Sequence, residues 1–359
     1  MNYDALIATR NRPNALQMSI PLMLKQKRPP SKLVVVDASD DHKAVCDVVN
    51  SVARVAEFEN FVILRSEKRN SAYQRNLGLA HIEAPIVAMP DDDSLWHPGF
   101  GEALVAAYEM DTTGVVGGVT ATPVLGSPLS TSDETYKKNN AAIFKSRMQA
   151  LRNSIEERFV PETFKLYARS LWDDQPAWID GLRYSRVETM SGFRMSFRTD
   201  VIKSIGFDET LGYGAGYSQH EDMDVSLRTQ KSGYILAATS DARVFHHVFP
   251  GARASGWSYG FCQVANTLYI CAKLFERKST MFPALQNYMR YKIFLYSLKR
   301  RESFWRDVHR GAQTAFSLRG ELFGADKSAL SQMYMSMCDK YIHPSCLKQA
   351  LSHSQHHSP

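Results

Sequence analysis

The chain has 359 residues, of which 44% are hydrophobic and 11% aromatic, enough for a proper core in one large domain or two moderate ones. Its net charge of +6 suits an anionic ligand, a phospholipid surface or nucleic acid, and does not separate these classes. Five scattered cysteines without CxxC spacing imply neither a disulfide framework nor a zinc knuckle, so a reducing compartment is the default.

No segment of the sequence predicts export or a membrane span. The opening MNYDALIATRNRP lacks the charged start and long apolar stretch of a signal peptide. The nearest candidate for a span, residues 261–275, is short and interrupted by Gln263, Asn266 and Lys273, which favours a buried or interfacial helix. We therefore expect a cytoplasmic protein, unless another feature carries it to the inner face of the plasma membrane.

The first 90 residues alternate between short apolar runs and helical patterns. Strands are expected at 4–9, 33–36, 61–64 and 86–89, and helices between Pro13 and Pro29, at 43–57 and at 71–80. This alternation predicts a parallel α/β sheet with right-handed crossovers. Ligands of such sheets bind beyond the carboxyl ends of the strands. We expect that face to gather the polar residues that follow strand ends: Thr9, Arg10, Asn11, Asp37, Asp91, Asp92 and Asp93.

The three consecutive aspartates at 91–93 indicate a cation site. Adjacent carboxylates repel one another, and a hard divalent cation neutralises them while bridging to phosphate. The alternative is a solvated acidic turn, where Asp is common. Because the chain has neither a GxGxxG after the first strand nor a P-loop, a bound diphosphate would need a metal and arginines such as Arg10, Arg69 or Arg75.

Residues 111–250 are harder to interpret. Strands are expected at 114–119, 190–197, 234–238 and 242–245, a polar loop at 127–140 and a helix within 141–171. The strand at 190–197 bears a glycine, which predicts that another group approaches closely there. Trp172, Trp178 and Tyr184 lie in a loop, where they could stack on a sugar or base or simply fill the core.

A glycine-rich loop at 212–217 precedes the sequence His220-Glu221-Asp222, from which a short helix should run to Gly233. Carboxylates at a helix start are favoured by the helix dipole, but they also suit a general base beneath a mobile glycine loop. His246 and His247 follow the last strand, either as metal ligands or as ordinary satisfied histidines.

Over about residues 3–250 the chain resembles family 2 of the inverting glycosyltransferases with the GT-A fold. Five ordered motifs carry the resemblance: LIATRNRP, VVVDASDD, RNSAYQRNLGLAHIEAPIVAMPDDD, GFDETLGYGAGYSQHEDMDVSLR and RVFHH. It implies a GT-A catalytic domain at 1–250, with a nucleotide-binding half (1–110) and an acceptor and catalytic half (111–250). A mostly helical C-terminal extension would follow at 251–359.

The resemblance also implies roles for individual residues. Thr9, Arg10, Asn11 and Asp37 would hold the base and ribose of a nucleoside-diphosphate sugar, linked to UDP, dTDP or GDP, and Arg75 and Asn76 would lie near the diphosphate. Asp91 and Asp93 would bind Mn²⁺ or Mg²⁺ with His246, while Asp92 contacts ribose or sugar. Asp222, in the Glu221-Asp222 pair, would be the catalytic base.

The acceptor is expected to be a saccharide or a lipid-linked saccharide, such as a bacterial surface glycan. Residues 286–291 (QNYMRY) lack the spacing and the Trp of the QxxRW motif of processive members, which favours the addition of one sugar. The C-terminal part mixes basic and aromatic residues, consistent with contact with a membrane surface or with packing on the catalytic domain or in a homodimer. Residues 352–359 are expected to be disordered.

Two other functions remain as alternatives. A nucleotidyltransferase acting on sugar phosphates also binds metal through aspartates on an α/β sheet, but it would want a glycine-rich loop after the first strand, where Arg10 to Pro13 have no glycine. A non-catalytic basic binding protein would use the net positive charge. The charges are mixed along the chain and no nucleic-acid module is recognisable, so we expect no nucleic-acid partner.

Overall fold

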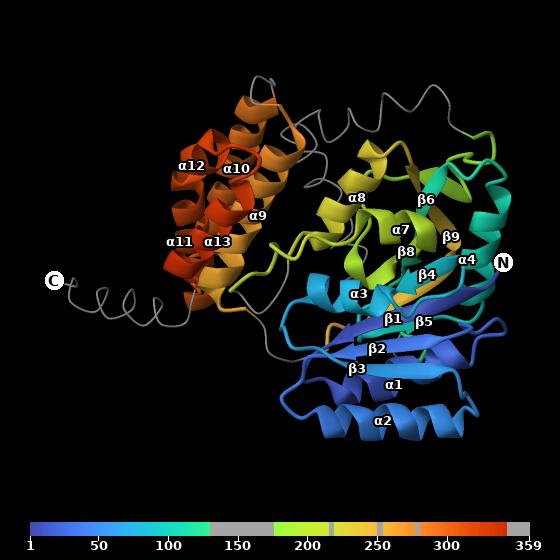
Figure 1. Ribbon diagram of the computed structural model, residues 1–359. Coiled ribbons are helices and arrows are strands. Elements are labelled where there is room, and N and C mark those ends of the chain that lie inside the picture. The colour runs from blue at the N-terminus through green and yellow to red at the C-terminus, as the bar shows by residue number, and fades with distance from the viewer. Residues whose placement is uncertain (130–175, 215–218, 250–253, 277–280, 343–359) are drawn as a thin grey trace.

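The computed structural model describes residues 1–129, 176–214, 219–249, 254–276 and 281–342. A mixed β-sheet with helices on its faces forms one part, and a bundle of helices stands beside it (Figure 1). The predicted helix within 141–171, Trp172 and the end at 352–359 lie outside the described residues, as do parts of the loops predicted at 127–140 and 212–217.

The N-terminal part alternates strands and helices as predicted. Its elements are β1 (Tyr3–Thr9), α1 (Pro13–Leu24), β2 (Leu33–Asp37), α2 (His42–Val55), β3 (Phe61–Arg65), α3 (Ser71–Leu79) and β4 (Ile86–Met89). The four strands pair in parallel in the order β3-β2-β1-β4. β2 and β4 are buried at every position, as continuous apolar runs in a covered parallel sheet should be.

Local sequence signals start the helices of this part. Pro13 occupies the first turn of α1, where a missing backbone N–H costs nothing. The Asp41 side chain accepts a hydrogen bond from Ala44 N and caps α2, and Asn70 caps α3 through Ala72 N and Tyr73 N. These caps determine where each helix starts, and so how long the loop is between each strand and the helix that follows it.

The second half of the sheet is mixed. It contains β5 (Ser94–Trp96), α4 (Phe100–Met110), β6 (Val116–Pro123), β7 (Tyr184–Arg186), the 3₁₀ turn η1 (Gly192–Arg194), β8 (Met195–Arg198), α7 (Thr199–Ile205), α8 (Glu221–Lys231) and β9 (Ile235–His246). β8 pairs antiparallel with both β4 and β6, and so joins the two halves into one sheet. The mostly parallel α/β architecture predicted from the sequence is confirmed, with antiparallel pairings confined to this half.

Several boundaries differ from the prediction here. The two strands expected at 234–238 and 242–245 form the single strand β9, which bends at a register shift against β6 instead of ending. The strand expected at 190–197 begins only at Met195, because the 3₁₀ turn occupies residues 192–194. The sequence reading also missed β5, α4 and α7, of which β5 has only three residues.

The predicted helical C-terminal region is confirmed over its described part. It consists of α9 (Gly256–Leu274), α10 (Met281–Leu298), α11 (Ser303–Ser317), α12 (Arg319–Gly324) and α13 (Leu330–Tyr341), which share a hydrophobic core. Among the described helices, none is long and apolar enough to cross a membrane. The domain boundary at residue 250 stays a prediction, since residues 250–253 are outside the description.

Helices α9 and α11 meet through glycines. A Cβ at Gly260 would collide with the backbone carbonyl of Val308, one at Gly256 with that of Phe304, and one at Gly311 with that of Trp257. Only residues without side chains allow two helix backbones to lie this close. The first turn of α11 is therefore held firmly against α9.

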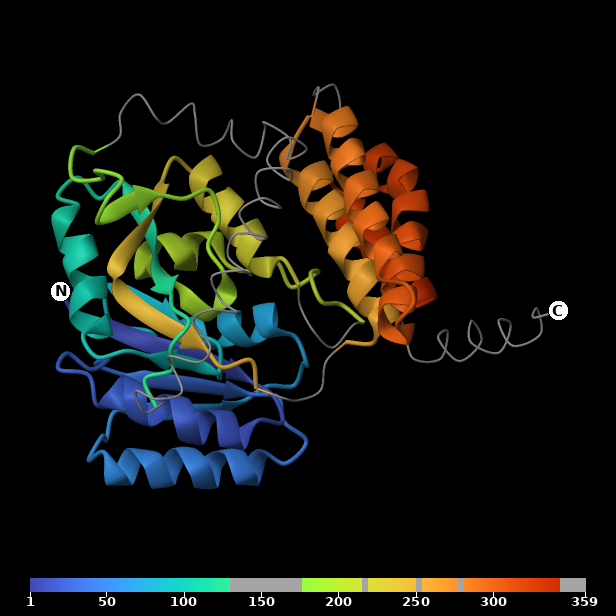
Figure 2. The ribbon, with the colours of Figure 1, turned by 180° about the vertical axis from the view of Figure 1, so that it is seen from behind.

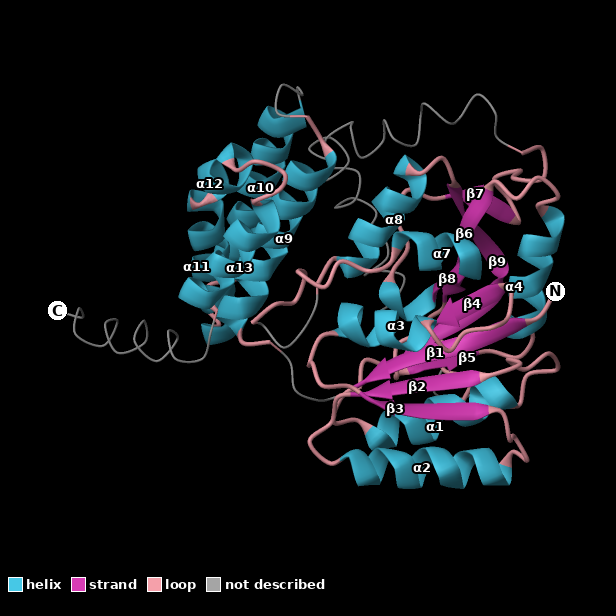
Figure 3. Cartoon of the chain, viewed as in Figure 1, coloured by secondary structure: helices cyan, strands magenta, loops and turns pink. Residues whose placement is uncertain are grey.

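The bundle is tied to the sheet domain by buried polar contacts. Lys273 of α9 forms ion pairs with Asp208 and with Asp224, whose side chain is fully buried. Asn266 of the same helix donates to the backbone carbonyl of Gln219, just before α8. The arrowheads of β1, β2 and β3 point to the side on which the bundle stands (Figure 3), and the reverse view shows the same arrangement (Figure 2). The carboxyl ends of the parallel strands thus face the bundle.

Candidate active site

A cavity of about 480 Å³ lies at the carboxyl ends of β1 and β4. Both parts of the molecule line it. The sheet domain contributes Ala8, Thr9, Arg10, Arg12, Arg69, Ser71, Gln74, Arg75, Asp91, Asp92, Asp93, Glu221, His246, Val248 and Phe249. The bundle and the residues leading into it contribute Ala254, Tyr259, Phe304 and Trp305.

Two members of the acidic run are folded inward, while the Asp91 side chain is 38% exposed. The side chains of Asp92 and Asp93 are only 6% and 4% exposed. Thr9 Oγ1 donates to Asp92 Oδ2 at 2.8 Å, and Arg12 Nη1 reaches Asp92 Oδ1 at 3.1 Å and Asp93 Oδ2 at 3.4 Å. Burial raises the pKa of Asp92 to about 7, although Arg12 opposes the shift. Arg12 was not singled out from the sequence, yet it is the cation that lies against this run.

Asp91, Asp93 and His246 offer ligand atoms that all lie within 4.8 Å of one another. Asp93 Oδ1 faces His246 Nε2 at 3.1 Å, but this buried oxygen accepts no hydrogen bond of good geometry. The imidazole is stacked on Phe193, with ring centroids 4.4 Å apart, which holds its orientation. Two carboxylates and one imidazole fit a divalent cation such as Mn²⁺ or Mg²⁺, and a cation would satisfy the unpartnered oxygen.

The surroundings raise the pKa of Asp91 and of His246 but lower that of Asp93. Burial raises the pKa of Asp91, with Asp93 and Glu221 adding to the shift against Arg75. Burial acts the same way on Asp93, but contact with His246 outweighs it and lowers the pKa of Asp93. Burial also opposes the charged form of His246, yet Asp93 raises the pKa of that imidazole. Asp93 and His246 thus stabilise each other's charged forms, and a cation bound by both side chains would take the place of the imidazolium proton.

Arg75 joins the acidic run to the start of α8. Its side chain is 3% exposed, donates to Glu221 Oε1 at 2.7 Å through Nη1, and donates to Asp91 Oδ1 at 3.0 Å through Nη2. Ser71 Oγ also lies 3.3 Å from Glu221 Oε1. Glu221 is therefore held by an ion pair with Arg75, whereas Asp222, the next residue, has no ion-pair partner among the described residues and accepts only backbone hydrogen bonds.

Asp222 is half-buried beside the turn at Gly192. Its Oδ2 accepts from Gly192 N at 2.9 Å and its Oδ1 from Met223 N at 2.8 Å. A Cβ on Gly192 would lie at ordinary contact distance from three groups, 3.4 Å from Arg75 Nη2, 3.6 Å from Asp91 Oδ1 and 3.9 Å from Asp222 Oδ2, so this turn lies between the two carboxylates. Burial, reinforced by Glu221, raises the pKa of Asp222 to about 7. A carboxylate with such a pKa is a stronger base than an exposed one.

The start of α8 places Asp222 through an unusual backbone conformation. His220, the residue before the helix, has φ 64°, in the left-handed region. Its buried imidazole lies 3.3 Å from Thr267 Oγ1 of α9, and burial lowers the pKa of His220 to about 4, so the ring is neutral. Helix α9 of the bundle therefore takes part in fixing the conformation from which Glu221 and Asp222 project.

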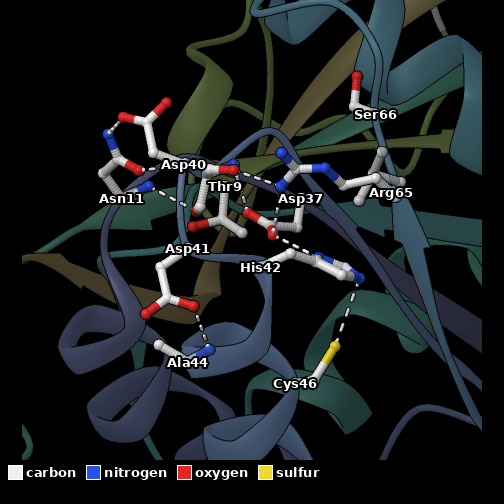
Figure 4. A network of polar contacts seen from close by, with 12 residues as sticks. Thr9, Asn11, Asp37, Asp40, Asp41, His42, Ala44, Cys46, Arg65 and Ser66 are labelled. Carbon is white, nitrogen blue, oxygen red and sulfur yellow. Dashed lines mark hydrogen bonds and ion pairs between the residues drawn. The ribbon is translucent and has the colours of Figure 1, made fainter.

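The loops after β1 and β2 are tied together beside the cavity (Figure 4). Asn11 N donates to Ser39 Oγ, and the Asn11 side chain both donates to Asp40 Oδ2 and accepts from Asp40 N. Asp37 is fully buried: its carboxylate accepts from Ser39 N and contacts His42 Nδ1 at 2.6 Å. These contacts give Asp37 a clear structural role in holding the loop.

The structure brings together most of the residues that the sequence singled out. Thr9, Arg10, Arg75, Asp91, Asp92, Asp93, Glu221 and His246 line the cavity, and Asp222 adjoins it through Gly192. Asn11, Asp37 and Asn76 are not among the lining residues. Asn76 instead binds the backbone of Phe207 through both its side-chain atoms, at 2.8 and 2.9 Å.

Some residues at the site went unrecognised in the sequence. Arg12 lies in the turn after β1, and a basic residue that close to a strand end could have been weighed with Arg10. The glycine expected at a close approach in 190–197 is Gly192. Tyr184 packs instead against Trp178 in the core, and neither lines the cavity. Of the aromatic residues that do line it, Phe249 follows β9, and Tyr259, Phe304 and Trp305 come from α9 and α11, where nothing in the sequence marks them.

Comparisons with known proteins relate this geometry to a family. Residues 4–174 match the model described as glycosyl transferase family 2. A search of curated proteins gave no significant match.

Among solved structures, the chain resembles a mannosyltransferase from Pyrobaculum calidifontis in complex with GDP-Man and Mn²⁺. That likeness has 16% identity and a TM-score of 0.50, and covers 98% of this chain and 87% of the other. A second is S. aureus TarS 1-349 in complex with UDP-GlcNAc, at 15% identity and a TM-score of 0.50, covering 95% and 91% of the two chains. At these identities the likeness establishes the fold.

Proposed function

The chain is a glycosyltransferase with a family 2 catalytic domain on a GT-A-type fold, and we propose that it moves one sugar from a nucleoside-diphosphate sugar to a hydroxyl acceptor with inversion. The observation that carries this proposal is the pairing at the cavity of an available carboxylate, Asp222, with a cluster suited to a divalent cation, Asp91, Asp93 and His246. Base and cation are the two groups that such a transfer needs.

The donor is expected to bind at the charged end of the cavity. Arg10, Arg12 and Arg69 line that end, where guanidinium groups suit the diphosphate of a UDP-, dTDP- or GDP-linked sugar. Thr9 would face the base and ribose, Asn11 and Asp37 would hold the loops after β1 and β2 that support this wall, and Asp92 would lie toward the ribose or sugar. The two solved structures named above contain GDP-Man and UDP-GlcNAc, which supports this class of donor.

The protein's own groups then act on the acceptor. Inversion requires in-line attack by the acceptor hydroxyl on the anomeric carbon, opposite the leaving diphosphate. Asp222 takes the hydroxyl proton as the new bond forms, and its raised pKa suits it to that task near neutral pH. Arg75 holds Glu221 and Asp91 in place on either side. Asp91, Asp93 and His246 would hold a bound Mn²⁺ or Mg²⁺, which would supply positive charge against the leaving diphosphate.

The remaining features of the proposal follow from the sequence. The acceptor is a saccharide or lipid-linked saccharide, and the protein acts in the cytoplasm or at the inner face of the plasma membrane. The exposed Phe294 and Leu298 of α10 are consistent with peripheral membrane contact or a homodimer contact. The alternatives, a nucleotidyltransferase and a non-catalytic basic binding protein, are disfavoured by the family match.

The test is the melting temperature of the protein with UDP, dTDP and GDP, each with Mn²⁺ and with EDTA. A ligand that binds only the folded state at 100 times its Kd stabilises it by about 2.7 kcal/mol. We expect one nucleotide to raise the melting temperature with Mn²⁺ and to lose most of that effect with EDTA. An Asp93→Asn variant should behave in Mn²⁺ as the wild type does in EDTA. No shift with any nucleotide in either condition would refute the proposal.

A further inference from the structure

Three aromatic side chains line the cavity from the bundle: Tyr259 of α9 and Phe304 and Trp305 of α11. We refer to them as the aromatic wall. The rings of Tyr259 and Phe304 are 6.2 Å apart and tilted by 43°, and those of Phe304 and Trp305 are 5.6 Å apart and nearly perpendicular. Phe304 is 44% exposed, although large aromatic side chains gain most from burial. An exposed ring facing a cavity is a surface prepared for a ligand.

The aromatic wall is held in a fixed position. Glycines 256 and 260 of α9 and Gly311 of α11 let the two backbones touch, with the carbonyl of Phe304 packed directly on Gly256. Behind the wall, Tyr296 is stacked with Trp305 at 6.0 Å, and Lys299 lies over the same indole at 4.4 Å. These contacts fix the rings without using the face of Phe304 that remains exposed. The wall is rigid before any ligand arrives, which lowers the cost of binding.

The chemistry of the cavity is divided between its two sides. Arginines and aspartates lie at the strand ends, whereas the described residues that the bundle side contributes to the lining, Ala254, Tyr259, Phe304 and Trp305, are all uncharged. A diphosphate has no favourable partner among phenyl and indole rings. The aromatic wall therefore suits the other substrate, provided that this substrate presents an apolar face and hydroxyl groups together.

We propose that Tyr259, Phe304 and Trp305 form the acceptor subsite and that it binds a pyranose ring of a saccharide acceptor. One face of a pyranose presents C–H groups that cover an aromatic ring, while its hydroxyls remain at the rim. A few polar groups then orient the ring, as is usual in ligand pockets. Glu221, which precedes the proposed base Asp222 at the start of α8, lines the same cavity as the aromatic wall, so a sugar on the wall shares one cavity with this end of α8.

This inference rests on the proposed function, and the experiment separates the two. The probes are the methyl α- and β-pyranosides of glucose, galactose, mannose and N-acetylglucosamine, titrated by saturation-transfer NMR in the presence of Mn²⁺ and the nucleotide that stabilises the protein. Phe304→Ala is the principal variant, because its exposed side chain can be removed without unfolding the chain. Phe294→Ala is the matched control, since that phenyl is 56% exposed on α10 and does not line the cavity.

We expect at least one glycoside to bind the wild type and Phe294→Ala equally, and to bind Phe304→Ala about tenfold more weakly, as the loss of one aromatic contact predicts. The stabilisation by nucleotide and Mn²⁺ should stay the same in all three proteins. Binding of no glycoside, or equal binding to Phe304→Ala, overturns the acceptor subsite while nucleotide binding still supports the transferase. If Phe304→Ala instead loses nucleotide binding, the wall holds the base of the donor and the inference is wrong.

Discussion

The two sides of the cavity differ in the interactions that hold their side chains in place. At the strand ends, charged side chains neutralise one another in buried pairs: Arg12 with Asp92 and Asp93, and Arg75 with Glu221 and Asp91. On the bundle side, backbone contacts between glycines hold uncharged rings in place. The first side is therefore sensitive to any change of charge, and the second to any change of shape. In the function proposed above, the charged side would carry out the chemistry and the aromatic side would bind the acceptor.

The charged side should be broken most severely by Asp222→Asn. Loss of a general base typically lowers turnover by about 10²–10⁴-fold. Because the raised pKa keeps part of the Asp222 population protonated below about 7, wild-type kcat/KM should rise with pH up to that point and then level off. The variant should lose this rise while it retains the Mn²⁺-dependent stabilisation by nucleotide. Turnover of sugar transfer by Asp222→Asn within threefold of the wild type would remove Asp222 as the base.

Removing the Arg75 guanidinium tests how much the buried ion pairs of the charged side contribute to the free energy of unfolding. Arg75→Met leaves Glu221 and Asp91 without their shared partner, and breaking a buried pair in this way costs about 3–5 kcal/mol. Urea unfolding should show that loss in the free energy of unfolding. The control is Arg54→Met, on the exposed face of α2, for which no change is expected. An Arg75→Met variant as stable as the control would show that the pair is screened by water.

The smallest of these effects is expected at the junction between the two sides. Lys273→Met removes the α9 partner of Asp208 and Asp224, although Arg228 still pairs with Asp224. Leaving a buried acceptor partly unsatisfied costs about 1–3 kcal/mol. Because α9 also contacts Gln219 and His220, turnover should fall together with stability.

Lys327→Met is the matched control for the junction, because its ion pair with Glu276 is exposed and should leave both quantities unchanged. If Lys273→Met loses stability but keeps full turnover, the bundle supports the fold without positioning the start of α8.

The residues on the charged side could be predicted from the sequence, because apolar runs and the polar residues that follow them are local sequence features. Continuous apolar runs predicted β1 to β4, and polar residues directly after them marked the cavity, as Thr9 and Asp91–Asp93 show. Parallel pairing then determines which strand ends meet. The triple aspartate itself indicated a cation site, because the repulsion it contains needs a partner.

The residues on the aromatic side could not be predicted from the sequence, because their position at the cavity depends on contacts between distant segments. Phe304 reaches the cavity only because Gly256 and Gly260, over forty residues earlier, admit α11 to the surface of α9. Asp37 and Asn76 show the same limit at the charged side. Both are predicted to serve the nucleotide; in the structure Asp37 contacts Ser39 and His42 close by in the sequence, and Asn76 binds the distant backbone of Phe207, a contact that no spacing in the sequence reveals.

Three glycines bring the backbones of α9 and α11 into contact, and this contact helps to fix the position of the aromatic wall whatever side chains form it. The helices are joined through backbone at Gly256, Gly260 and Gly311, and this contact adds to the packing of the side chains of Phe304 and Trp305. Exchanging those two side chains would change the shape offered to an acceptor while the catalytic carboxylates stay where they are. Substitutions at Phe304 and Trp305, in the first turn of α11, should therefore change which acceptor the enzyme prefers.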